Sequence, residues 1–153
     1  MSPQAVKALC ESFPSARFEF KIEWETEVAF VADKLFAIHG FDKENYRILT
    51  LKAKPEDGEY LRQNYETIIT PGYHMNKRHW ISVRLDEIHD DELVQQLALN
   101  SYNLIVDKLP RRIRETCEKR DFHCGSLFFL VRYSLVFASR RKPLKITTKV
   151  LPS

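Results

Sequence analysis

Four segments near the start of the chain alternate apolar and polar residues, and only short turns separate them. They are residues 18–22, 26–31, 34–41 and 46–52. Because successive side chains of a strand point to opposite faces, this alternation predicts half-buried β-strands. A turn of a few residues can join antiparallel strands, whereas parallel strands need a connection of a dozen or more residues. The chain is therefore predicted to build an antiparallel sheet.

Helical patterns surround these strands. Apolar residues recur with helical spacing in residues 3–13, and the clearest helical stripe runs from Val94 to Leu109, where Pro110 ends or restarts the helix. Pro55 opens another helix, and residues 79–85 form a strand. Residues 111–120 are read as one or two further basic helical turns. The order α-β-β-β-(β)-α-β-α predicts an α+β fold in which an antiparallel sheet packs against helices.

Charge divides the chain of 153 residues into two parts. Residues 1–107 hold 12 basic and 18 acidic side chains, whereas residues 108–153 hold 12 basic and 3 acidic ones. We therefore expect a domain over residues 1–112 and a basic C-terminal extension over residues 113–153. The extension leans to β-structure, as a hairpin of residues 127–138 and 144–150 or as a partly disordered tail. Basic tails meet nucleic acid, anionic lipid or acidic partners, and the alternative is a solvated surface.

Cysteine content and apolar patterning indicate a cytoplasmic protein. Three cysteines cannot form a disulfide framework, and an odd count favours a reducing compartment. Charged residues interrupt the first 30 positions, so no secretory signal is expected. The longest apolar stretch, residues 127–138, contains Arg132 and is shorter than the ~18 residues of a spanning helix. No stable membrane span is predicted.

The segment from Pro71 to Trp80 concentrates basic, aromatic and imidazole side chains just before a strand. Its distinctive residues are Tyr73, His74, Asn76, Lys77, Arg78, His79 and Trp80. Alternation places His79 with the aliphatic residues 81, 83 and 85 on the core face, and Trp80 with Arg78 and Arg84 on the other face. An aromatic ring between two arginines fits a surface that binds phosphates and stacks on bases. The alternative is that a helix covers Trp80 and the arginines extend past it.

Enzyme and metal signatures are weaker. The chain has no Gly-rich phosphate loop, no G-x-S-x-G and no H-E-x-x-H motif. The acidic residues 90–92 are read as helix-capping residues. Cys117, His123 and Cys124 have no standard zinc spacing, and His74 and His79 do not form the i, i+4 pair of a zinc helix. We expect no metal and no cofactor, and the sequence favours a non-enzymatic protein.

Several landmarks together resemble the MmcQ/YjbR family over residues 3–112. They are the turn Phe13-Pro14-Ser15-Ala16, the hairpin of residues 28–36, Leu49-Thr50-Leu51-Lys52 before Pro55, the stretch of residues 71–85, Asn100-Ser101-Tyr102 and Lys108-Leu109-Pro110. The resemblance implies a CyaY-like, or double-wing, α+β fold and DNA binding. It singles out Lys52, Asn76, Lys77, His79 and Trp80. The matched region is net acidic here, and residues 113–153 have no counterpart in the family.

The leading functional prediction is a non-enzymatic protein that binds DNA through residues 73–84, with help from the basic tail. The predicted binding residues are Lys52, Tyr73, His74, Asn76, Lys77, Arg78, His79, Trp80 and Arg84. One alternative is a protein-interaction module that uses the Trp80 face and the apolar tail. The other is a small-ligand binder or an enzyme with a pocket formed by His74 and His79.

Overall fold

The computed structural model describes residues 1–119, so the strands that the sequence predicts at residues 127–138 and 144–150 lie outside the described residues. In chain order, the elements are α1 (Pro3–Glu11), β1 (Ala16–Lys21), the 3-10 helix η1 (Ile22–Trp24), β2 (Thr26–Val31), β3 (Lys34–Phe41), β4 (Arg47–Lys52), α2 (Pro55–Asn64), β5 (Ile69–Pro71), β6 (Trp80–Arg84), α3 (Asp91–Val106) and α4 (Arg111–Lys119).

Short turns join the first strands, as the alternation predicts. Ala32 and Asp33 alone connect β2 to β3, and both have positive φ angles, of 47° and 58°. Two residues with positive φ match the right-handed twist of a tight hairpin. Before β4, the side chain of Asp42 accepts hydrogen bonds from the backbone N–H groups of Glu44 and Tyr46. This local bonding fixes the turn and the direction of the next strand.

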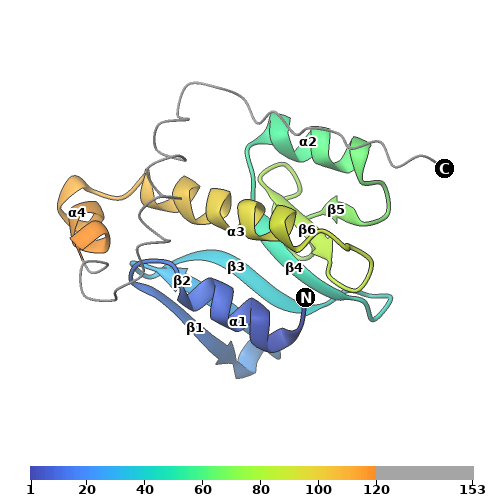
Figure 1. The fold of residues 1–153 in the computed structure, drawn as a ribbon, viewed down its shortest axis with the longest axis horizontal. Coiled ribbons are helices and arrows are strands. Elements are labelled where there is room, and N and C mark those ends of the chain that lie inside the picture. The colour runs from blue at the N-terminus through green and yellow to red at the C-terminus, as the bar shows by residue number, and fades with distance from the viewer. Residues whose placement is uncertain (120–153) are drawn as a thin grey trace. The chain divides into compact units, whose positions relative to one another are not determined.

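The six strands form one antiparallel sheet in the order β1-β2-β3-β4-β6-β5. Helices α1 and α3 lie across one side of this sheet, and α2 packs beside β5 (Figure 1). The α+β prediction is confirmed. Strand β5 was not predicted, because residues 70–72 carry the Pro-Gly signal of a turn. Only three residues of β5 pair with β6, and its Pro71 stands at the sheet edge, where a missing N–H is tolerated.

Three aromatic rings join α1, α3 and the sheet. Phe13 stacks on Tyr102 with 5.1 Å between ring centroids, and both rings meet Phe36 edge-on, at 5.9 and 5.6 Å. Offset and edge-on contacts of this kind add to the free energy gained from burial alone. The hydroxyl of the fully buried Tyr102 donates a hydrogen bond to the carbonyl of Pro14 at 2.8 Å. The long helix is thereby tied to the turn after α1.

A second polar contact holds α3 against the centre of the sheet. The pairing of β2 with β3 is irregular at Ala29/Phe30, which leaves Phe36 outside the regular ladder. The fully buried hydroxyl of Ser101 donates to the carbonyl of Phe36 and accepts from the N–H of Lys52 at 2.8 Å. One side chain of α3 thus satisfies two backbone groups, one on β3 and one on β4.

Helix α4 confirms the predicted basic helix after Pro110. It crosses residue 112, the predicted end of the first domain, and its Cys117 is buried. The other two residues that the sequence analysis considered with Cys117 as metal ligands, His123 and Cys124, lie outside the described residues. Between residues 1 and 119, no helix has the length and apolar character needed to cross a membrane.

Candidate functional site

Strand β6 presents the two faces that alternation predicts. Ile81 and Val83 pair with Leu51 and Leu49 of β4, and all four side chains are buried. On the opposite face, Trp80, Ser82 and Arg84 pair with Lys52, Thr50 and Ile48. His79 differs from the prediction, because β6 begins only at Trp80 and His79 lies exposed in the turn before it. It therefore belongs to the loop and not to the core.

Trp80 is buried rather than exposed. Only 7% of its surface is accessible, so its ring cannot stack on a base in this conformation. A Cβ added at Gly72 would lie 2.5 Å from the Cβ of Trp80, so position 72 accepts only glycine while the two chain segments lie this close. The ammonium group of Lys52 lies 5.5 Å from the centre of the Trp80 ring, within the range of a cation–π contact. The expected exposed stacking surface at Trp80 is therefore wrong, because its neighbours cover the ring.

Arg84 is occupied by carboxylates. Its guanidinium group lies 3.0 Å from Asp42 and 2.7 Å from Glu44, and a third carboxylate, that of Glu87, lies at 3.9 Å. It also packs on the ring of Tyr46, at 4.1 Å from the centroid. A guanidinium that is already paired with acids gains little from a phosphate. Arg84 therefore braces the turn before β4, and the structure does not present it as a free cation.

The loop of residues 72–79 is anchored to the sheet through a hydrogen bond to β6. The hydroxyl groups of Thr50 and Ser82 are buried and lie 2.7 Å apart. The backbone N–H of Tyr73 donates to the Ser82 hydroxyl at 2.9 Å, which draws the start of the loop onto this face. His74 follows with a φ of 57°, a left-handed conformation that is uncommon outside glycine. The Tyr73 and His74 rings lie 4.0 Å apart. These contacts define how the rest of the loop is displayed.

The distal part of the loop carries exposed cations. Asn76 accepts a hydrogen bond from the backbone N–H of Arg78 at 2.9 Å, which closes a tight turn around Lys77. The side chains of Asn76, Lys77 and Arg78 are all exposed, as are those of His74 and His79. The loop thus brings most of the predicted binding residues to one surface, without Trp80 and Arg84.

Two further segments extend this positive surface. The N–H of Ala53 donates to the carbonyl of His79 at 2.9 Å, so the end of β4 and the first residues before α2 run beside the loop. Burial, and next the positive charge of Lys108, lower the pKa of Lys52. We call the resulting group of five side chains the basic cluster. Its members are Lys52, Lys54, Lys77, Arg78 and Lys108.

The cations of the basic cluster are not paired with carboxylates of the described residues. Across the described part of the chain, no carboxylate forms an ion pair with any of its five cations. Lys54 and Lys108 were not predicted as site residues. Neither stands next to the loop in sequence. Lys54 follows Ala53, whose N–H donates to His79, and Lys108 lies close enough to Lys52 to lower its pKa.

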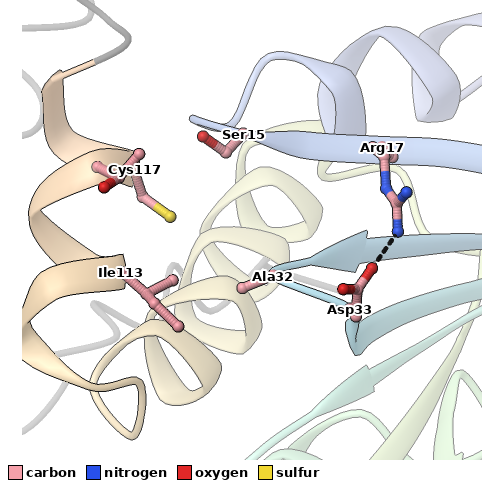
Figure 2. A pocket seen from close by; sticks show the side chains of 7 residues that line it. Ser15, Arg17, Ala32, Asp33, Ile113 and Cys117 are labelled. Atoms are coloured by element: carbon pink, nitrogen blue, oxygen red, sulfur yellow. Dashed lines mark hydrogen bonds and ion pairs between the residues drawn. The ribbon is translucent and has the colours of Figure 1, made fainter.

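A pocket of about 250 Å³ lies elsewhere, between the β2–β3 turn, the start of β1 and helix α4. Figure 2 shows Arg17 and Asp33 joined on one side of it, with Ile113 and Cys117 of α4 on the other. The Arg17–Asp33 contact of 2.6 Å leaves no free charge on that side. Neither His74 nor His79 lines this pocket, so it is not the small-ligand site that the sequence offered as an alternative.

Comparisons with known proteins agree with this fold. The family model described as YjbR matches residues 11–104. The chain is 32% identical to YbdF of Escherichia coli O157:H7 (71% of this chain, 88% of the relative) and 34% identical to YjbR of Escherichia coli K12 (69% and 88%). None of these names specifies a ligand or a reaction.

Solved structures give the same result. A crystal structure of a Deinococcus radiodurans protein with a DUF419 domain superposes with a TM-score of 0.67 at 32% identity, covering 75% of this chain and 86% of that chain. A Pseudomonas syringae protein superposes with a TM-score of 0.57 at 25% identity, covering 68% and 98%. The family model spans more than half of the chain, and the Escherichia coli relatives are matched over most of their length, so the chain belongs to the YjbR family.

Proposed function

We propose that this protein binds DNA through contacts between the basic cluster and backbone phosphates, without catalysing a reaction. The observation that carries the proposal is the display of Lys77 and Arg78 on a loop fastened to the sheet, with no acidic partner in the described part of the chain. Most affinity for DNA comes from cations that neutralise phosphates. A loop anchored through Tyr73 and Ser82 holds such cations in place before the ligand arrives.

The acidic charge of the rest of the domain directs a polyanion to the basic cluster. Residues 1–107 are net acidic, so a polyanion is repelled by most of the surface and attracted where cations are unpaired. Elsewhere, cations such as Arg17, Arg47 and Arg84 are neutralised by nearby carboxylates. Among the described residues, no carboxylate pairs with the basic cluster, which offers up to five positive charges to a polyanion.

The chemistry of the cluster favours backbone contacts over reading of sequence. Lysine and arginine side chains on phosphates position a protein on the duplex but carry no sequence information. With Trp80 buried, no large aromatic ring of β6 is free to stack on a base. Besides its two cations, the loop exposes the polar side chains of His74, Asn76 and His79, which are placed to touch base edges. DNA binding should therefore depend only weakly on base sequence, and the basic extension of residues 113–153 adds further affinity.

Salt dependence tests this assignment. For duplex DNA, each phosphate contact contributes about 0.9 to the slope of log affinity against log salt concentration. We expect Lys77→Ala/Arg78→Ala to reduce the slope by about 1.8, measured by fluorescence anisotropy with the full chain. The matched control is Lys34→Ala/Lys43→Ala, which removes two exposed cations that have no ion pair among the described residues and lie outside the cluster. A double variant at the loop with the wild-type slope would refute the role of the loop.

A further inference from the structure

A second surface, remote from the basic cluster, exposes large apolar side chains. Phe20, Ile22, Trp24 and Phe41 are 60%, 79%, 58% and 59% accessible, and they account for four of the six large hydrophobic residues exposed in residues 1–119. Side chains of this size cover about 150–250 Å² each, so together they leave roughly 500 Å² of apolar surface in water. This is at the upper end of the apolar patches found on monomeric proteins, where large patches mark interaction sites.

The register of the sheet gathers these four side chains at one corner. Phe20 stands near the end of β1, and η1 carries Ile22 and Trp24 across to the start of β2. Phe41 ends β3 beside that point, because Glu27 pairs with His39 and the Thr26 hydroxyl donates to the carbonyl of His39. Strand β1 begins next to α4 and runs away from it to this corner (Figure 1). We call these four residues the apolar corner.

Acidic side chains border the apolar corner. Glu23 and Glu25 stand on either side of Trp24, both exposed. Neither forms an ion pair with any residue in the described range 1–119. The lysine of this segment, Lys21, is already held by Glu19 at 2.7 Å. Glu25 also has a positive φ of 49° and closes η1 through its backbone N–H, which fixes the acids beside the tryptophan.

We propose that the apolar corner binds a cationic amphipathic segment of a partner protein, with apolar side chains against Trp24 and Ile22 and lysines or arginines against Glu23 and Glu25. The free carboxylates supply charge complementarity to such a segment. Among the described residues, β1 is an edge strand of the sheet, and an edge strand is where a neighbouring chain can add by backbone pairing.

A second copy of this chain fits the corner less well. In a twofold dimer the same patch faces itself, so Glu23 and Glu25 of both copies would meet at the edge of the contact. Four unpaired carboxylates would then approach one another, and like charges across an interface oppose association. A polyanion such as DNA is disfavoured for the same reason, which separates this surface from the basic cluster.

Tryptophan fluorescence gives a direct test with the full chain. Trp24 is exposed and Trp80 is buried, so burial of the corner shifts the emission of Trp24 to shorter wavelength. The probe is a 14-residue amphipathic peptide of leucine and lysine, without any nucleic acid. Its controls are a leucine–glutamate peptide with the same apolar pattern and a lysine–serine peptide without an apolar face. We expect saturable binding and a blue shift only for the leucine–lysine peptide.

Two matched pairs of variants locate the binding. Ile22→Ser/Phe41→Ser and Glu23→Gln/Glu25→Gln should each weaken the peptide by about tenfold or more, as loss of central or charged contacts does. The matched controls, Tyr60→Ser and Glu56→Gln/Glu59→Gln, change exposed residues of α2 and should leave binding unchanged. Circular dichroism and a thermal melt check that each variant is folded.

Three results would overturn the proposal. The first two are equal binding of the leucine–glutamate peptide and unchanged peptide affinity in both corner variants. The third is a blue shift of the protein alone as its concentration is raised, accompanied by a dimer in analytical ultracentrifugation. The last result would assign the corner to a second copy. Because no DNA is present, each outcome is independent of the function proposed for the basic cluster.

Discussion

Removing the hydroxyl of Ser101 should destabilise the protein out of proportion to its size. Ser101→Ala leaves the carbonyl of Phe36 and the N–H of Lys52 without their hydrogen-bond partner. A buried backbone group without a partner costs about 1–3 kcal/mol. Alanine recovers up to about 0.5 kcal/mol through its higher helix propensity. Two such groups together cost about 2–6 kcal/mol, so we expect the free energy of unfolding to fall by about 1.5–5.5 kcal/mol.

Urea unfolding followed by circular dichroism measures this loss. The midpoint should move to lower urea with little change of slope, because the folded and unfolded states keep the same difference in exposed surface. Gln96→Ala on the exposed face of α3 is the matched control and should stay within about 0.5 kcal/mol of wild type. If Ser101→Ala also stays within that range, water or another group satisfies both backbone atoms, and the Ser101 hydroxyl does not hold α3 to the sheet. Since the bond to Lys52 places the end of β4, the variant should also weaken DNA binding.

Three further measurements probe other contacts. Tyr102→Phe should lower stability by about 1–2 kcal/mol in the same urea assay, because it orphans the buried carbonyl of Pro14; an unchanged midpoint would contradict this. Hydrogen bonds from Arg47 lower the pKa of Asp86 in the folded state. The ionised carboxylate therefore stabilises the fold fully above about pH 4, and this contribution is lost as the pH falls through the lowered pKa. Asp86→Asn should thus cost under about 1 kcal/mol at pH 7, because the carboxylate is partly exposed, and should match wild type in acid; a difference that persists in acid would argue against it. Burial raises the pKa of Cys10 to about 12, so its thiol should react with a disulfide reagent at pH 8 only after unfolding; rapid labelling mapped to Cys10 in the native chain would show an open helix α1.

Period-two alternation and turn chemistry predicted most of the fold. They predicted β1 to β4 and the two faces of β6, and helical spacing predicted the long helix α3, because each of these signals depends on residues close in sequence. Strand β5 was missed, because three residues with a Pro-Gly turn signal carry no readable period. Its pairing depends on β6, which lies farther along the chain.

The site was predicted only in part, because its charges are matched by distant segments. The sequence found the loop of residues 72–79, where unusual residues stand side by side. It did not show that Asp42 and Glu44, some forty residues earlier, neutralise Arg84. It also did not show that Trp80 is buried with the Lys52 ammonium group near its ring, or that Lys108 lies close to Lys52. Exposed apolar residues in η1 gave no signal, because a strand pattern assigns them to the core.

The most direct test of the account is to map where DNA meets the protein. Two-dimensional ¹⁵N–¹H NMR spectra of the labelled full chain, recorded while a short duplex is added, report on each backbone amide. We predict that the shifted signals among the described residues are those of residues 52–54, 73–79 and 108, and that the shifts become smaller as salt is raised. Shifts concentrated at residues 20–25, or no shift in the loop at a DNA concentration that saturates binding, would contradict it.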